Sequence, residues 1–189
     1  MKRSGFVLAA SSVIMLGLGG AAFGAEGYAQ HKAFGPGFHS IEAPIGFRYW
    51  LSPQKLAVDL GFGFDSQPAG IDPTEKEKAY ALELGVPIVC RSWERAHALI
   101  RPGILYQSQQ IGFDADPGPG FQFDTDNEKT LDLQLEGEAE VFLVENVSVS
   151  AAHGFRFRRF TPAFGGDSES SFGTRGSNFT TIGFHIYLY

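Results

Sequence analysis

A run of alternating residues at positions 131–143 constrains the fold of this chain more than any other feature. Every second side chain is apolar or small, and those between them are mostly acidic or amide groups. Successive side chains of a β-strand point to opposite faces, so a period of two indicates a strand with one apolar and one different face. No sustained period of 3.6 residues runs through the rest of the chain. We therefore expect an all-β protein.

The same alternation predicts six further strands. They cover residues 45–51, 56–64, 80–90, 97–109, 147–160 and 179–189. The connecting segments are short after the first, third and fifth strands and long after the others, at residues 65–78, 114–129 and 161–178. Outer-membrane barrels alternate short periplasmic turns with longer extracellular loops in this way. Because such barrels have an even number of strands, we place an eighth strand around residues 28–41.

Residues 1–25 contain the three parts of a secretory signal peptide. Lys2 and Arg3 form a charged start, residues 6–18 form an apolar stretch, and small residues around Phe23 form a cleavage site. A transmembrane helix is the alternative, because about eighteen residues here lack charge. No positively charged flank follows to stop transfer through the membrane. We therefore expect a signal peptide at 1–25 and one barrel domain at 26–189.

The two faces of the strands distinguish a membrane barrel from a soluble one. A soluble barrel has its apolar face inside, whereas a membrane barrel has lipid outside and a polar lumen. The less apolar face here is rich in glycine and alanine, which suit a narrow lumen. It also carries charges of both signs, which we predict to form a lumen charge network of Arg48, Asp59, Glu83, Arg101, Asp132, Glu136, Glu138, Glu140, Arg156 and Arg158.

Buried charges must be paired, because an unpaired one costs several kcal/mol. The six carboxylates of this network outnumber its four guanidinium groups. We expect the surplus carboxylates to be protonated, hydrated or paired with His97 or His185.

Large aromatic residues fall where the predicted strands meet the two membrane interfaces, as in membrane proteins. The expected aromatic girdle contains Tyr49, Trp50, Trp93, Tyr187 and Tyr189 at the periplasmic rim, and Tyr80 and Tyr106 near the outer rim. We therefore predict an all-β fold, an eight-stranded antiparallel up-and-down transmembrane β-barrel. A soluble secreted barrel that binds an apolar ligand is the alternative.

In two segments the chain resembles the small OmpA/OmpX-type outer-membrane β-barrel domain family of Gram-negative bacteria. Residues 46–52 running into 56–63 look like that family's strand–turn–strand, and residues 183–189 look like its closing strand with a terminal aromatic residue. The resemblance implies a location in the cell outer membrane, contact with outer-membrane lipid and lipopolysaccharide, and recognition of the C-terminal strand by the barrel assembly machinery. It implies a fold rather than a particular function.

The closing strand departs from the family pattern in one respect. Its apolar residues, Ile182, Phe184, Ile186 and Leu188, alternate out of register with the terminal aromatic residue. Either a bulge shifts the apolar face, or both Tyr187 and Tyr189 point inward.

No residue pattern indicates a catalytic, cofactor or metal site. Glu136, Glu138 and Glu140 could suggest paired-carboxylate catalysis or a cation site, but we interpret them as part of the lumen charge network. None of the five histidines has metal-ligand spacing, and none is followed two residues later by the serine of a His-x-Ser lipid hydrolase element. The net charge of −6 argues against a nucleic-acid partner.

We therefore expect a monomeric, non-enzymatic outer-membrane protein with a plugged polar lumen, surface-exposed loops and a structural or surface-interaction role. A lipid-modifying membrane enzyme and a narrow pore are the alternatives.

Overall fold

The computed structural model describes residues 34–52, 55–68, 76–114, 123–174 and 180–188. The signal peptide predicted at 1–25 and Tyr189 lie outside these ranges. The strands are β1 (Phe34–Phe38), β2 (Ile45–Ser52), β3 (Leu56–Pro68), β4 (Lys76–Gly85), β5 (Ile88–Trp93), β6 (Ala96–Asp114), β7 (Phe123–Val144), β8 (Val147–Thr161), β9 (Glu169–Gly173) and β10 (Thr181–Ile186). Within the described ranges, no helix is long and apolar enough to cross a membrane.

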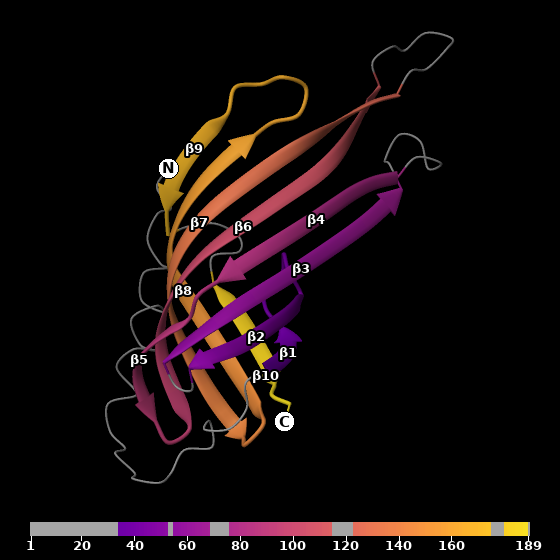
Figure 1. Cartoon of the computed structure of the whole chain (residues 1–189). Helices are drawn as coiled ribbons and strands as arrows, with labels where there is room; N and C mark the ends of the chain where they lie inside the picture. The colour runs from indigo at the N-terminus through magenta and orange to yellow at the C-terminus, as the bar shows by residue number, and fades with distance from the viewer. Residues whose placement is uncertain (1–33, 53–54, 69–75, 115–122, 175–179, 189) are drawn as a thin grey trace, which may run out of the picture.

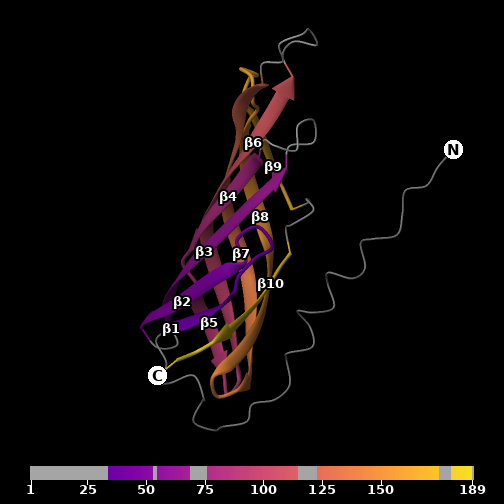
Figure 2. The same ribbon diagram turned by 90° about the vertical axis from the view of Figure 1, so that its right-hand side faces the viewer.

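Eight of these strands close into an antiparallel barrel (Figures 1 and 2). The order is β1, β2, β3, β4, β6, β7, β8 and β10, and β10 closes the ring because it pairs with both β8 and β1. The register of the strand pairs gives the stagger of the barrel. From Gly37, successive partners through β2, β3, β4, β6 and β7 lead to Arg158 of β8, whereas partners through β10 lead to Ser148 of β8. The stagger is the separation of these two positions, which is ten residues. Such a stagger makes the strands tilt against the barrel axis. The predicted eight-stranded antiparallel barrel is confirmed.

The first strand of the barrel is β1, which lies within the range expected from the strand count. It pairs with β2 on one side and with β10 on the other. Several strands are longer than the alternation indicated, because β3, β4, β6 and β7 extend into the segments at 65–78 and 114–129 that were predicted to be loops.

The prediction of one unbroken strand over residues 80–90 is wrong. β4 ends at Gly85, and β5 starts at Ile88 between the same neighbours, β3 and β6. Pro87 has no backbone N–H to donate to the ladder, so the strand breaks there. The backbone carbonyl of Pro87 still accepts a hydrogen bond from the N–H of Ala57 at 2.9 Å.

The prediction that residues 161–178 form only a loop is also wrong. β9 lies within this segment and pairs with the upper part of β8, while β10 pairs with its lower part. β9 lies outside the closed ring. It contains only five residues, which are too few to show an alternating pattern in the sequence.

The exposed side of the barrel wall is apolar and the enclosed side is polar. On β7, Leu131, Leu133 and Leu135 are between 40 and 50% exposed, whereas the intervening Asp132 and Gln134 are at most 7% exposed. A soluble barrel has the opposite arrangement, because water favours polar groups outside.

Candidate functional site

Arg48 lies at the centre of the charged lumen. It projects inward from β2 and is 1% exposed. Its guanidinium donates to Asp59 on β3 at 2.7 and 2.9 Å and to Glu138 on β7 at 2.8 and 3.0 Å. Its Nη1 atom also lies 3.2 Å from Oε2 of Glu140. One side chain therefore links three strands across the lumen.

Arg101 on β6 forms a second centre beside the first. It donates to Asp59 at 2.8 Å, to Glu83 at 2.7 Å and to Glu136 at 2.7 Å. Its Nη2 atom also contacts the Nε2 atom of His39. Asp59 thus accepts hydrogen bonds from two arginines, which compensates for its burial.

A third group lies higher in the barrel, on β7 and β8. Arg158 donates to both carboxylate oxygens of Asp132 at 2.8 Å, and Arg156 lies 3.4 Å from the same carboxylate. The Asp132 side chain is fully buried, whereas the Arg158 side chain is 37% exposed. The structure therefore places the ten residues of the predicted lumen charge network on the inner side of the barrel, each within ion-pair distance of at least one other member, in two separate groups.

The surplus carboxylates do not pair with His97 or His185 in the described residues. The hydroxyl groups of Ser148 and Tyr187 donate to Glu140 at 2.6 and 2.7 Å. Ser40 and Thr181 donate to Glu83 and Glu136 in the same way, at 2.9 and 3.3 Å, and His39 lies 3.5 Å from Glu83. His39 and Ser40 come from the irregular segment after β1, which has no clear alternation. Ser148, Thr181 and Tyr187 lie in predicted strands, but the predicted network contained only acidic residues and arginines.

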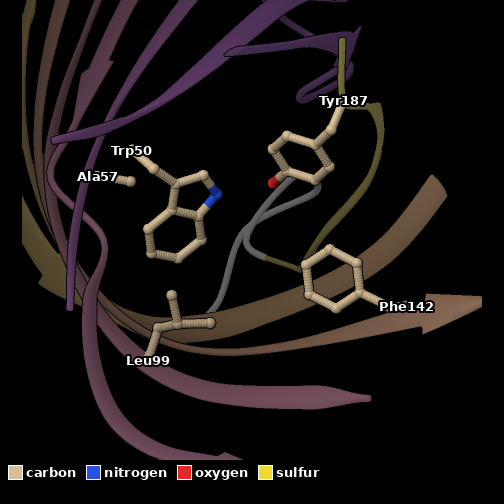
Figure 3. Close-up of a cluster of buried hydrophobic side chains, with 5 residues drawn as sticks. All are labelled: Trp50, Ala57, Leu99, Phe142 and Tyr187. Carbon is tan, nitrogen blue, oxygen red and sulfur yellow. The ribbon is translucent and has the colours of Figure 1, made fainter. Parts of the chain in front are cut away.

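Below the charges, five buried side chains from five segments of the wall form a lower apolar plug, shown in Figure 3. They are Trp50, Ala57, Leu99, Phe142 and Tyr187. The ring of His97 packs edge-on between Trp50 and Phe142, with centroids 5.7 and 5.4 Å apart. The lumen is therefore occupied by apolar side chains at one level and by ion pairs at the next.

Two residues of the predicted aromatic girdle belong to this plug, so that prediction is wrong for Trp50 and Tyr187. Trp50 is 8% exposed and Tyr187 is 2% exposed. Trp50 follows Arg48 by two positions, so alternation places both side chains inside. Tyr187 is likewise two positions beyond His185, which is the inward register that the closing strand allowed.

The other girdle residues are placed differently. Tyr49 and Tyr80 are 49 and 43% exposed on the outer face, the side on which a girdle residue would lie. Trp93 and Tyr106 are half-buried, and the guanidinium of Arg91 lies 5.1 Å from the Trp93 ring centroid. Tyr189 lies outside the described residues.

Residues 39–44, between β1 and β2, fold into the upper end of the barrel. A tight turn is held by the N–H of Ala43, which donates to the Ser40 hydroxyl at 3.1 Å. The loop packs on β3, where a Cβ atom at Gly63 would collide with the carbonyl oxygen of Glu42. Gly63 therefore allows the loop to lie against the inner wall.

A cavity of about 250 Å³ with both polar and apolar side chains in its lining adjoins this loop and is formed by the loop and by β3, β4, β6 and β7. We call it the upper pocket. Its inward-facing side chains include Glu42, Asp65, Gln107, Gln109, Glu128 and Thr130. Among the described residues that line it, none is lysine, arginine or histidine.

In the described part of the chain, no group of three or more His, Cys, Asp or Glu side chains is arranged to hold a metal ion. Comparison with protein-family models, with curated proteins and with solved structures gave no match.

Proposed function

We propose that this chain is a small integral protein of the cell outer membrane, with a filled lumen and a structural or surface-interaction role. One observation carries the proposal: large apolar side chains cover the outside of a closed barrel, and charged side chains fill its inside. Outside-facing leucine and phenylalanine stabilise a barrel in hydrocarbon, whereas in water they would favour aggregation.

The packing of the lumen supports a protein that does not conduct ions. The ion pairs of Arg48 and Arg101 join β2, β3, β4, β6 and β7 across the interior. The lower apolar plug lies beneath them. An eight-stranded barrel has room for side chains but little more, so these groups take up the interior.

The upper ends of β6 and β7 support a role at the cell surface. Above Leu131, the outward positions of β7 change from apolar residues to Lys129 and Asn127, which are both exposed. Polar side chains are expected where a strand leaves the hydrocarbon region. The ends of these two strands would then face the medium, while lipid and lipopolysaccharide surround the wall below. We further propose that the barrel is monomeric and that the assembly machinery recognises its C-terminal strand.

Fractionation tests the location. We expect the full chain in the outer-membrane fraction, and we expect an unboiled sample to migrate differently from a boiled one on a denaturing gel. Recovery in the soluble fraction without detergent would overturn the proposal and favour a soluble barrel.

Planar-bilayer recording tests the filled lumen. We expect no stable unitary conductance from the purified barrel, with a porin measured in parallel as the positive control. A reproducible conductance step would support the narrow pore instead.

A further inference from the structure

The barrel wall is unusually low on one side. β1, β10 and β2 contain five, six and eight residues, whereas β6 and β7 contain 19 and 22. A strand needs about 9–11 residues to cross a bilayer. Over the described residues, the wall formed by β10, β1 and β2 is therefore too short to cross it alone. Above this side, Figure 1 shows β3, β4, β6, β7, β8 and β9 continuing upward as an open curved sheet.

The open sheet has two free strand edges. β2 begins at Ile45, opposite Phe62, so among the residues that the structure describes, 63–68 of β3 pair only with β4. Within the described residues, β9 pairs only with β8. Unpaired backbone groups cannot face hydrocarbon without a cost of several kcal/mol each. Where this opening borders hydrocarbon, a bound molecule that offers polar groups would satisfy these backbone groups.

The rim of the opening carries the four most exposed large apolar side chains of the described structure. They are Ile41 of the loop, Phe172 of β9, Ile182 of β10 and Phe64 of β3, with exposures of 72, 71, 66 and 62%. They belong to four separate segments that border the opening, and we call them the apolar rim. Ile41 and Phe64 line the same cavity. An apolar rim of this kind favours contact with acyl chains.

The upper pocket adjoins this rim, because Ile41 and Phe64 belong to the residues that line it. Amide and hydroxyl groups of Gln107, Gln109 and Thr130 can hydrogen-bond a ligand there. The carboxylates of Glu42, Asp65 and Glu128 determine which charge the pocket prefers. Glu42 interacts electrostatically with Arg158, and Asp65 accepts a hydrogen bond from the Gln67 amide at 2.6 Å. The described lining contains three carboxylates and no cationic side chain, so the pocket has an excess of negative charge.

We propose that this opening binds one membrane lipid whose head group carries a primary amine, with the amine in the upper pocket and the acyl chains against the apolar rim. The inference rests on the proposed membrane location. An anionic head group would be repelled by the three carboxylates, whereas an ammonium group would form charge-assisted hydrogen bonds with them.

Native mass spectrometry of the full chain, released from detergent micelles, tests this proposal. The probes are phosphatidylethanolamine and phosphatidylglycerol with identical acyl chains. We expect one molecule of phosphatidylethanolamine per barrel, retained about tenfold better than phosphatidylglycerol. The triple variant E42Q/D65N/E128Q should lose this preference, while Glu145→Gln, an exposed carboxylate in the β7–β8 turn, should retain it.

The apolar contribution has its own matched pair. Phe64→Ala at the rim should weaken retention of both lipids, whereas Leu51→Ala on the outer face near the opposite end should not. Every variant must keep the heat-modifiable gel mobility of the folded barrel, and each triple-variant carboxylate can be changed singly if the triple variant does not fold.

Two failures can be distinguished. A barrel that requires detergent but binds both lipids equally, or binds neither, overturns the lipid site and leaves the proposed function standing. A chain that is soluble without detergent overturns both.

Discussion

Arg48 and Asp59 are direct cross-strand partners on β2 and β3 and are joined by two parallel hydrogen bonds. The Arg48 Nε atom donates to Oδ1 at 2.7 Å, and Nη2 donates to Oδ2 at 2.9 Å. This bidentate geometry suits the planar guanidinium, and lysine could not reproduce it. Because Arg48 also contacts two carboxylates of β7, the pair connects neighbouring strands to the opposite wall.

The first prediction concerns this pair. Arg48→Met removes the guanidinium from Asp59, Glu138 and Glu140 while keeping an apolar side chain of similar length. We expect the free energy of unfolding to fall by about 3–5 kcal/mol, because buried carboxylates lose their partner. Urea unfolding in lipid vesicles, followed by tryptophan fluorescence, measures the change. Arg159→Met, at an exposed position on β8, should change stability by less than about 0.5 kcal/mol, and an equal loss in both variants would contradict the assignment.

The second prediction concerns the loop at residues 39–44. Gly63→Val places side-chain atoms against the Glu42 carbonyl, so we expect the loop to move out of the barrel at a cost of about 1–3 kcal/mol. Cleavage after Glu42 by a glutamyl endopeptidase should then be faster than in the parent chain. Ser66→Val, on the exposed outer face of β3, is the matched control and should leave the cleavage rate unchanged.

The third prediction separates the lumen from the membrane surface by means of the two tryptophans. Trp50 lies in the lower apolar plug, so its fluorescence in a Trp93→Phe variant should be quenched little by brominated acyl chains or by acrylamide. Trp93, observed alone in Trp50→Phe, should be quenched more strongly because it is only half-buried, at the end of β5 next to the turn into β6. Strong quenching of Trp50 by brominated lipid would show that its side chain faces the membrane, as the girdle prediction expects.

The fourth prediction concerns a pH-dependent contact above the apolar wall. Asp126 on β7 accepts the backbone N–H of Asn127 at 2.7 Å and that of Phe164 at 2.6 Å. These two hydrogen bonds lower the pKa of Asp126 below its ordinary value of 3.8. Because the pKa is lowered by folding, the contact stabilises the β8–β9 connection above pH 3.8 and is lost as the pH falls through the lower, folded value.

Hydrogen exchange measured by NMR in micelles checks this contact. Protection of the Phe164 amide should be the same at pH 7 and pH 5 and should decrease below pH 3.8. Asp126→Ala should remove the protection at every pH, whereas Asp167→Ala, an exposed carboxylate in the same connection, should leave it unchanged. Protection that persists in Asp126→Ala would show that the carboxylate is not the acceptor that matters.

Alternation along single strands predicted most of the wall and the lumen charge network. It placed Asp132, Glu136 and Arg101 on the inner face, because a side chain's face depends only on its position within its own strand. It failed for β9, which is too short to show a period, and at Pro87, where a missing N–H interrupts the ladder. For Trp50, the expected girdle role conflicted with the alternation, and the alternation was correct.

The sequence by itself therefore determined that the chain forms strands, which face of each strand is apolar, and that the strands are numerous enough for a barrel of eight. Only the tertiary structure decided which carboxylate each arginine binds, how residues 39–44 enter the lumen, and that the wall is low beside β1, β2 and β10. These features depend on the stagger between strands that are far apart in the sequence. Local alternation contains no information about that stagger, because it repeats every two residues and is compatible with any even shift of register.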